Sequence, residues 1–270
     1  VFLFAGVCVA LSLHSNFVQY LTLSAGWHVL RLYGAAQAVV QGALLVALSF
    51  WVTALWFQVY SVKLILVTAC LAVLAVAVVI AGIFKRPQTD FEIEGTLLAP
   101  DATAPLWGEL RALCGKVGTD PPDQIVAGID DNFFVPEHPL TVEGRKVDGR
   151  TLFVSLSLLK QLNGREADAV LAHEMAHFSG RDTLYSKKIS PLLMRYGSYL
   201  GALQNGGVTL PIFYFMLCFR AMFELSLQRL GRQREIRADR IAAETTSPEA
   251  FAGAMLRTVA YSKYRQQVER

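Results

Sequence analysis

The residues best suited to chemistry in this chain are two histidines and a glutamate within five consecutive positions. The segment reads His173-Glu174-Met175-Ala176-His177. Residues four apart on a helix lie on one face, so His173 and His177 can bind a single metal ion. Glu174 lies about 100° around the helix, where its carboxylate can act on a water molecule without binding the metal itself. The spacing predicts the metal-binding helix of a zinc hydrolase, with Glu174 as general base.

A catalytic zinc ion needs a third protein ligand, and the chain offers two kinds of candidate. Zinc in hydrolases is held by three protein side chains and keeps one position open for water. His138 lies in an expected loop, and no geometric argument places it near the motif. Glu235 and Asp239 share one face of a later helix, which could also be an ordinary solvated face. We favour Glu235 as the ligand and expect Asp239 to accept a hydrogen bond from a ligand histidine.

The elements that must position these residues have clear signals. Asn163 and Glu166 form a capping-box pattern that starts the motif helix, which is expected to end near Gly180. Short apolar runs bounded by turn residues predict strands at 125–129 and 151–155. We expect an extended substrate to add as a further strand along residues 151–155, because this strand directly precedes the motif helix.

The first third of the chain is almost without charge. Between residues 1 and 84 only Arg31 and Lys63 carry a formal charge. The runs 35–57 and 64–84 are each long enough to cross roughly 30 Å of hydrocarbon. The apolar run 1–13 is shorter and fits a truncated span or the core of a signal segment. A transmembrane anchor is therefore expected over residues 1–86.

The remaining part, residues 87–270, has the charge content of a water-facing domain. A connector helix is expected at 104–116. The apolar stretches 189–203 and 208–219 are too short for full spans and suit buried or re-entrant helices, and a further helix is expected over 220–243. The expected fold class is mainly α with a small β-sheet, a zincin-like α+β catalytic domain preceded by transmembrane helices.

Charge and cysteine usage exclude several classes of protein. The net charge is only +3 and no basic tract is present, so we expect no nucleic-acid partner. The four cysteines form no Cys-x-x-Cys pair, which argues against a structural zinc site or a disulfide framework. Lys85 and Arg86 follow the second span directly, so the downstream domain is expected on the cytoplasmic side.

Two segments carry a resemblance to a known family. They are His173-Glu174-Met175-Ala176-His177-Phe178-Ser179-Gly180-Arg181-Asp182 and Arg232-Gln233-Arg234-Glu235-Ile236-Arg237-Ala238-Asp239. The chain resembles the HtpX and CAAX-prenyl-protease family of membrane zinc metallopeptidases. The resemblance implies one Zn²⁺ per chain held by His173, His177 and Glu235. It also implies that Glu174 is the catalytic base.

The resemblance extends to supporting residues and has departures. Asp239 and Asp182 match aspartates of the two family motifs. Gly231 stands where the family often has a serine, and a substrate contact by Asn132 rests only on a partial match to the family's Asn-Ala-Phe stretch. Arg232 and Tyr185 are candidate donors to the oxyanion of the transition state.

The function expected is that of a membrane-bound zinc endopeptidase in membrane-protein quality control. The alternatives are a signalling or prenyl-protein-processing metalloprotease and a catalytically inactive membrane adaptor of the same fold. Charged residues flank the motif at Arg165, Glu166 and Asp168, and such charges are costly in lipid, so the metal site is expected to face water. The expected partners are protein or peptide substrates and the lipid bilayer of a bacterial inner membrane.

Overall fold

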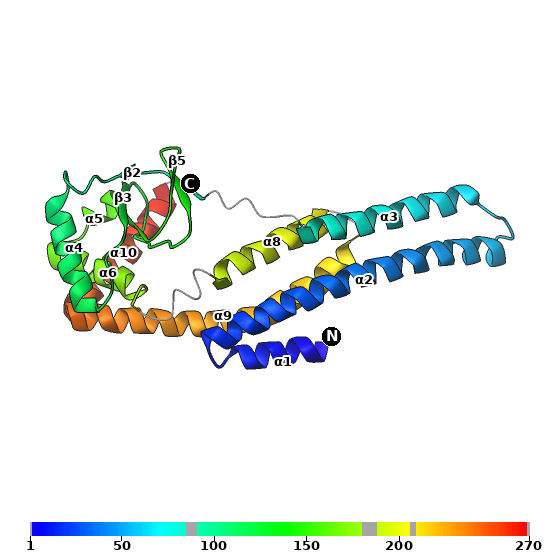
Figure 1. The fold of residues 1–270 in the computed structure, drawn as a ribbon, viewed down its shortest axis with the longest axis horizontal. Coiled ribbons are helices and arrows are strands. Elements are labelled where there is room, and N and C mark those ends of the chain that lie inside the picture. The colour runs from blue at the N-terminus through cyan, green and yellow to red at the C-terminus, as the bar shows by residue number, and fades with distance from the viewer. Residues whose placement is uncertain (1, 85–90, 180–187, 206–208, 269–270) are drawn as a thin grey trace. The chain divides into compact units, whose positions relative to one another are not determined.

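The computed structural model of this protein describes residues 2–84, 91–179, 188–205 and 209–268. Over these residues the chain is mainly helical, with two small three-stranded sheets (Figure 1), as the expected fold class requires. The chain divides into two compact units. The first unit comprises residues 1–87 and 189–229, and the second comprises residues 88–188 and 230–270. The predicted continuous domain 87–270 is therefore shared between the two units.

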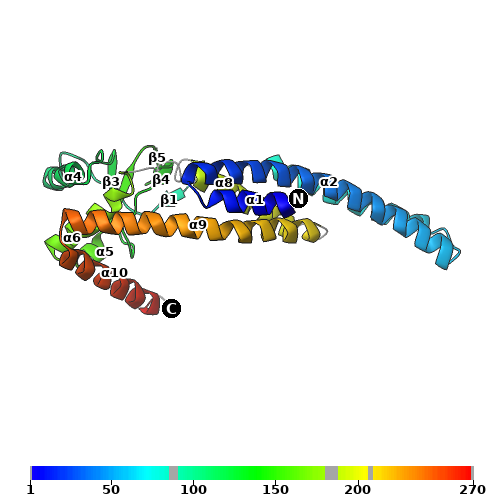
Figure 2. The same cartoon turned by 90° about the horizontal axis from the view of Figure 1, so that it is seen from below.

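The first unit is made of helices alone among the residues described. They are α1 (Phe2–Ser12), α2 (Asn16–Trp56), α3 (Val62–Phe84), α8 (Ser190–Asn205) and the first part of α9 (Leu210–Thr245). Helices α2 and α3 pack side by side along the hairpin that joins them, and α1 packs on α2 (Figures 1 and 2). Three of these helices, α2, α3 and α9, are long and apolar enough to cross a membrane.

Helix α2 begins earlier than the predicted span at 35–57. The Ser15 side chain caps it by accepting the Val18 N–H, and the helix then continues for 41 residues. The polar positions before residue 35 are explained by packing within the unit. Gln19 is buried and donates to the Ser226 hydroxyl at 3.0 Å. A Cβ on Gly26 would lie 2.6 Å from the Phe219 ring, so this glycine allows α9 to approach α2 closely.

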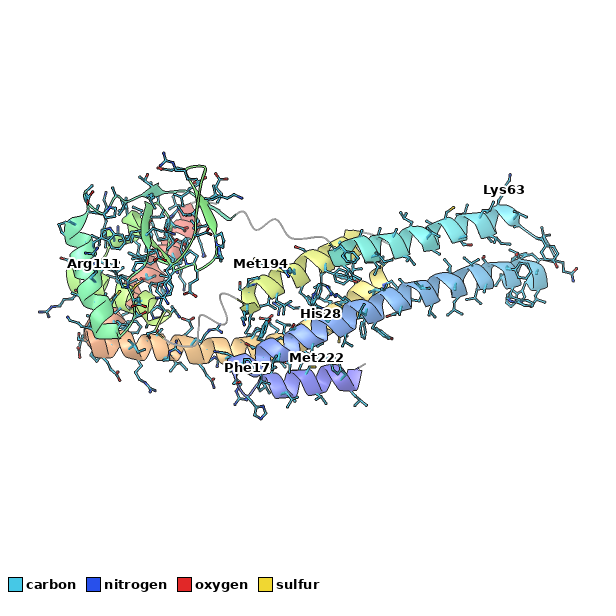
Figure 3. The ribbon with its side chains drawn as sticks, in the orientation of Figure 1. Phe17, His28, Lys63, Arg111, Met194 and Met222 are labelled. Atoms are coloured by element: carbon cyan, nitrogen blue, oxygen red, sulfur yellow. The ribbon has the colours of Figure 1, made fainter. Side chains whose placement is uncertain are left out.

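Charged side chains of the first unit lie near helix ends or polar neighbours. Lys63 lies at the start of α3, beside the turn from α2 (Figure 3). Arg31 lies within α2, where its guanidinium is 2.8 Å from Nδ1 of His28 and 5.6 Å from the centre of the Trp27 ring. The aromatic ring and the imidazole thus accommodate the one arginine of this helix.

Residues 208–243 were expected to form two separate elements, and the structure shows that this prediction is wrong. The expected elements were an apolar stretch at 208–219 and a helix at 220–243. Instead, Leu210–Thr245 is one helix of 36 residues (Figure 2). The residues from Leu210 to Thr245 include no proline after Pro211 and only Gly231 among glycines, so nothing in the local sequence ends the helix. Helix α8 covers the other apolar stretch and is 16 residues long.

The second unit combines small sheets with helices. Its elements are β1 (Phe91–Ile93), β2 (Thr96–Leu97), α4 (Ala104–Val117), β3 (Gln124–Gly128), β4 (Leu140–Val142), β5 (Arg145–Val147), β6 (Thr151–Ser155), α5 (Leu156–Leu159), α6 (Gly164–Ala176), the end of α9 and α10 (Pro248–Val268). The strands form two sheets of order β1-β4-β5 and β2-β3-β6. The predicted strands at 125–129 and 151–155 and the helix at 104–116 are confirmed to within one residue at each end.

The core of the second unit holds α6 against the second sheet. Strands β3 and β6 run parallel, with Ile125 opposite Leu152. These two side chains are fully buried with Val170 and Met175 from α6 and Leu110 from α4. One apolar face of α6 therefore packs inward, which leaves the histidine face to meet other elements.

The hypothesis that a substrate adds along β6 is wrong. Every residue of β6 is buried. Phe153 exchanges backbone hydrogen bonds with Phe134 at 2.9 and 3.4 Å, and the Thr151 N–H donates to the Pro136 carbonyl at 3.1 Å. The segment after Asn132 folds back along β6 and occupies the edge that was expected to be free.

Candidate metal centre

The motif helix α6 is set by the predicted capping box. The side chain of Asn163 accepts the Glu166 N–H at 2.9 Å, and the side chain of Glu166 accepts the Asn163 N–H at 2.9 Å. The helix ends at Ala176, sooner than expected, and Gly180 lies outside the residues described. His177 keeps right-handed helical dihedrals as the C-cap residue. The i, i+4 relation between the two histidines is therefore maintained.

Three donor atoms from two helices converge on one point. Nε2 of His173 lies 3.3 Å from Nε2 of His177. Oε2 of Glu235, on α9, lies 3.6 Å from the first of these nitrogens and 3.8 Å from the second. A tetrahedral zinc ion with bonds of roughly 2.0–2.2 Å needs donor atoms about 3.3–3.6 Å apart. Two edges of the donor triangle lie within this range, and the third, between Glu235 and His177, is 3.8 Å and exceeds it slightly.

His173 is held from two further sides. Its Nδ1 lies 3.0 Å from Oδ1 of Asp239, one helical turn after Glu235. The ring also stacks against Phe251 of α10, with centroids 6.1 Å apart and planes at 20°. A carboxylate at Nδ1 favours the tautomer whose proton is on that nitrogen, which leaves the Nε2 lone pair for a metal.

The pKa shifts in the centre arise from burial and from the contacts between carboxylates and imidazoles. Burial raises the pKa of Glu174 to about 7, against the opposing effect of His173 and His177. The contact with His173 lowers the pKa of Glu235. Burial disfavours the charged form of His173, but Glu235, Glu174 and Asp239 outweigh it and raise its pKa. The centre thus concentrates negative charge beside two imidazoles, as a cation site requires.

One side of the centre is open to solvent. The side chains of Glu235 and Asp239 are 58% and 45% exposed, whereas that of His173 is only 12% exposed. A ligand set that is buried on the α6 side and open on the α9 side leaves space for water and a substrate. Such an open ligand set is typical of a catalytic metal site and unlike a closed structural one.

Among the described residues, Asn132, Arg232 and His138 are predicted site residues that do not join this cluster. Asn132 is exposed, and its side chain accepts the Phe133 N–H at 2.9 Å, as a turn-forming asparagine does. Arg232 is exposed on α9, three residues before Glu235. Asp182 and Tyr185 lie outside the residues described. His138 is absent from the His/Glu cluster found in the described part of the chain.

Helix α10 supplies supports that the sequence analysis missed. Besides Phe251, it contributes Arg257, whose Nε lies 3.0 Å from Oε1 of Glu166. Glu166 is buried, so the capping-box residue is also one half of an ion pair across 91 positions. No local pattern indicates such a pairing, because it depends on how α10 folds back onto α6.

Two histidines on one helix and a glutamate on a second define the class of glutamate-type zincin metallopeptidase sites. Residues 142–266 match the model of peptidase family M48. The resemblance to the HtpX type of membrane metallopeptidase is also confirmed.

Several relatives are named as HtpX proteases. A "Protease HtpX homolog" of Polynucleobacter necessarius is 34% identical over 122 residues, which cover 42% of each protein. "Protease HtpX homolog 2" of Methanosarcina mazei is 27% identical over 60% of this chain and 58% of its own length. "Protease HtpX" of Idiomarina loihiensis is 27% identical over 45% of this chain and 47% of its own length. The chain thus spans about half the length of these relatives, and no solved structure matches it.

Proposed function

We propose that this protein is a membrane-bound zinc endopeptidase whose metal ligands are His173, His177 and Glu235. The observation that supports this most strongly is the triangle of donor atoms, with edges of 3.3, 3.6 and 3.8 Å. A solvated charged face would not require two partly buried imidazoles and a carboxylate from another helix to converge. The proposal includes one zinc ion per chain and protein or peptide substrates.

The chemistry of the proposed reaction is divided among few groups. His173, His177 and Glu235 would hold the zinc ion, which when bound would supply Lewis acidity toward water and a peptide carbonyl. Glu174 accepts the proton of the attacking water and delivers it to the leaving nitrogen, as a general base and then a general acid. Asp239 orients His173 through Nδ1. Arg232 and Tyr185 are the proposed donors to the developing oxyanion, and Asn132 is a proposed substrate contact.

The proposed setting is the cytoplasmic side of a bacterial inner membrane. The three long apolar helices and the HtpX relatives indicate an integral membrane protein. Lys85 and Arg86 directly follow α3, and the excess of positive charge at cytoplasmic ends of spans supports the orientation. A membrane-anchored endopeptidase open to water would act on membrane proteins with exposed or damaged segments, which is a quality-control role.

Cleavage of casein by the detergent-solubilised full chain tests the proposed activity. The wild-type protein should cleave, and a zinc chelator or the Glu174→Gln substitution should abolish cleavage. Glu244→Gln is the matched control, because Glu244 is exposed on α9 beyond the cluster. Equal cleavage by the wild-type and Glu174→Gln proteins would exclude the proposed mechanism.

A further inference from the structure

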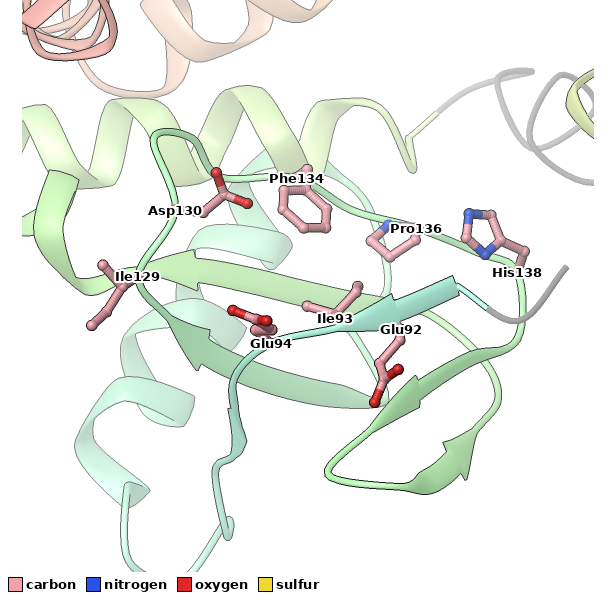
Figure 4. Close-up of a pocket in the computed structure, with 8 residues that line it drawn as sticks. All are labelled: Glu92, Ile93, Glu94, Ile129, Asp130, Phe134, Pro136 and His138. Atoms are coloured by element: carbon pink, nitrogen blue, oxygen red, sulfur yellow. The ribbon is translucent and has the colours of Figure 1, made fainter. Parts of the chain in front are cut away.

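A groove in the second unit is separate from the metal ligands and has no role in the reaction described above. It has a volume of about 570 Å³ and lies between β1 and the segment 129–138 (Figure 4). None of the residues that line it belongs to the His/Glu cluster. A volume of this size is within the range of pockets that bind ligands, roughly 300–1,000 Å³.

One wall of the groove is an edge strand. Strand β1 pairs with β4 on one side, and in the described part of the chain no strand pairs with its other side. An edge strand presents backbone N–H and C=O groups to which another extended segment can bind. Ile93 of this strand lines the groove between two glutamates.

The opposite wall is an extended segment that is already anchored. Phe134 and Pro136 line the groove, and their backbones bond to β6 on the other side. The Phe134 ring stacks on Phe153 with centroids 4.5 Å apart and planes at 10°. Ile129 forms the apolar end of the groove and is 78% exposed. The groove therefore offers apolar surface along a wall that is held in place.

Close backbone packing holds the β1 wall as well. A Cβ on Gly128 would lie 2.6 Å from the carbonyl oxygen of Glu94, so the chain leaving β1 crosses β3 at a distance that only glycine allows. Both walls are thus formed before any ligand binds. Preformed walls lower the entropic cost of binding an extended segment.

The rim of the groove is acidic. Glu92, Glu94 and Asp130 line it and are exposed. No ion pair joins any of the three to a lysine or arginine among the residues that the structure describes. Three carboxylates beside apolar surface and a strand edge complement an extended segment with a basic side chain.

We propose that this groove binds an extended polypeptide segment carrying a lysine or arginine, which adds to the edge of β1 as a further strand. Its basic side chain lies among Glu92, Glu94 and Asp130, and its apolar side chains contact Phe134 and Ile129. The inference rests on the proposed peptidase function for the view that this segment belongs to a substrate. It thereby names a substrate class: unfolded segments with basic and large apolar residues.

Binding to a full-length Glu174→Gln protein in detergent tests the charge preference. The probes are two fluorescent ten-residue peptides of alternating apolar residues, identical except for a central Lys or Gln. The Lys peptide should bind about two- to fivefold more tightly, as expected for exposed ion pairs, and the difference should shrink at high salt.

Substitutions of the acidic residues at the rim test whether the preference for the Lys peptide arises in the groove. Adding Glu92→Gln and Glu94→Gln should remove most of the preference for Lys, and Asp130→Asn should reduce it on its own. Glu109→Gln is the matched control, because Glu109 is exposed on α4 and does not line the groove. Equal affinities for the two peptides, or the same loss with Glu109→Gln, would overturn the proposal.

Backbone methylation tests the added strand. Alternate N–H groups of a strand point to opposite sides, so only one parity of the peptide would bond to β1. N-methylation of alternate residues should abolish binding in one parity and preserve it in the other. Equal tolerance of both parities would exclude strand addition.

The two proposals fail in distinguishable ways. If the Lys peptide binds selectively but the zinc-loaded wild-type chain cleaves neither it nor casein, the groove assignment stands and the peptidase function fails. If casein is cleaved but Lys and Gln peptides bind equally, the peptidase function stands and the groove assignment fails.

Discussion

At the scale of single residues, the centre is built from donors whose roles differ although they lie within one small cluster. His173 lies in the last turn of α6 and His177 is the C-cap residue of that helix, whereas Glu235 comes from α9 and is the most exposed of the three. Oδ1 of Asp239 lies 3.0 Å from Nδ1 of His173, on the side of the ring away from the other donor atoms, and we expect it to position this ring. Substitution of each residue should therefore affect a different property, such as metal affinity or the pH dependence of stability.

Asp239→Ala should weaken zinc binding without removing a ligand. Loss of a carboxylate behind a ligand histidine typically costs about 10- to 100-fold in metal affinity. Competition with a chromogenic chelator measures this affinity in the purified protein. Glu244→Gln should leave the affinity unchanged, and an unchanged affinity in Asp239→Ala would contradict the positioning role.

The raised pKa of Glu174 predicts that the stability of the chelator-treated, metal-free protein depends on pH. Its pKa in the folded chain is raised from 4.5 to about 7, so the folded state binds this proton more tightly than the unfolded state does. The resulting stabilisation is complete below the unfolded-state pKa and is lost as the pH rises through about 7.

Glu174→Gln removes this titration, because glutamine stays neutral at every pH. The variant should therefore gain thermal stability relative to the wild type between about pH 5 and pH 8. Thermal unfolding of both proteins across this range measures the difference. A difference that does not change with pH would show that the Glu174 carboxyl is not perturbed.

At the scale of elements, short sequence patterns predicted those helix starts and strands that depend on neighbouring residues alone. The capping box at Asn163 and Glu166 set the start of α6, and short apolar runs located β3 and β6. The pairing of Phe134 with Phe153 could not be predicted, because it depends on how a loop folds back rather than on any residue pattern. The contribution of α10 was missed for the same reason.

Arg257→Ala should destabilise the second unit by about 1–3 kcal/mol, the cost of leaving a buried acceptor without its partner. The buried Glu166 carboxylate would keep only the Asn163 N–H. Chemical denaturation followed by a probe in the second unit measures the loss. Lys263→Ala, an exposed change on the same helix, is the control, and equal stability of the two variants would refute the role of the ion pair.

At the scale of the whole molecule, α9 begins in the first unit and ends in the second. The spans at 35–57 and 64–84 were predicted from apolar length alone. The extension of α2 back to Asn16 was not, because the buried Gln19 and the packed Gly26 look polar or flexible until α9 is placed beside them. The grouping of residues 189–229 with the N-terminal helices likewise depends on long-range packing.

The proposed topology predicts labelling from opposite sides of the membrane. In a cysteine-free background, Lys63→Cys should react with an impermeant maleimide in intact spheroplasts, because Lys63 lies beside the α2–α3 turn. Glu109→Cys, in the second unit, should react only after permeabilisation. The opposite pattern would place the metal centre outside the cytoplasm.

The zinc content of the purified protein tests the central claim most directly, since the account rests on three converging ligands. Elemental analysis should find about one zinc per chain in the wild-type, Glu174→Gln and Glu244→Gln proteins, and far less in Glu235→Ala. A Glu235→Ala protein that retains a full zinc ion would contradict the three-ligand centre.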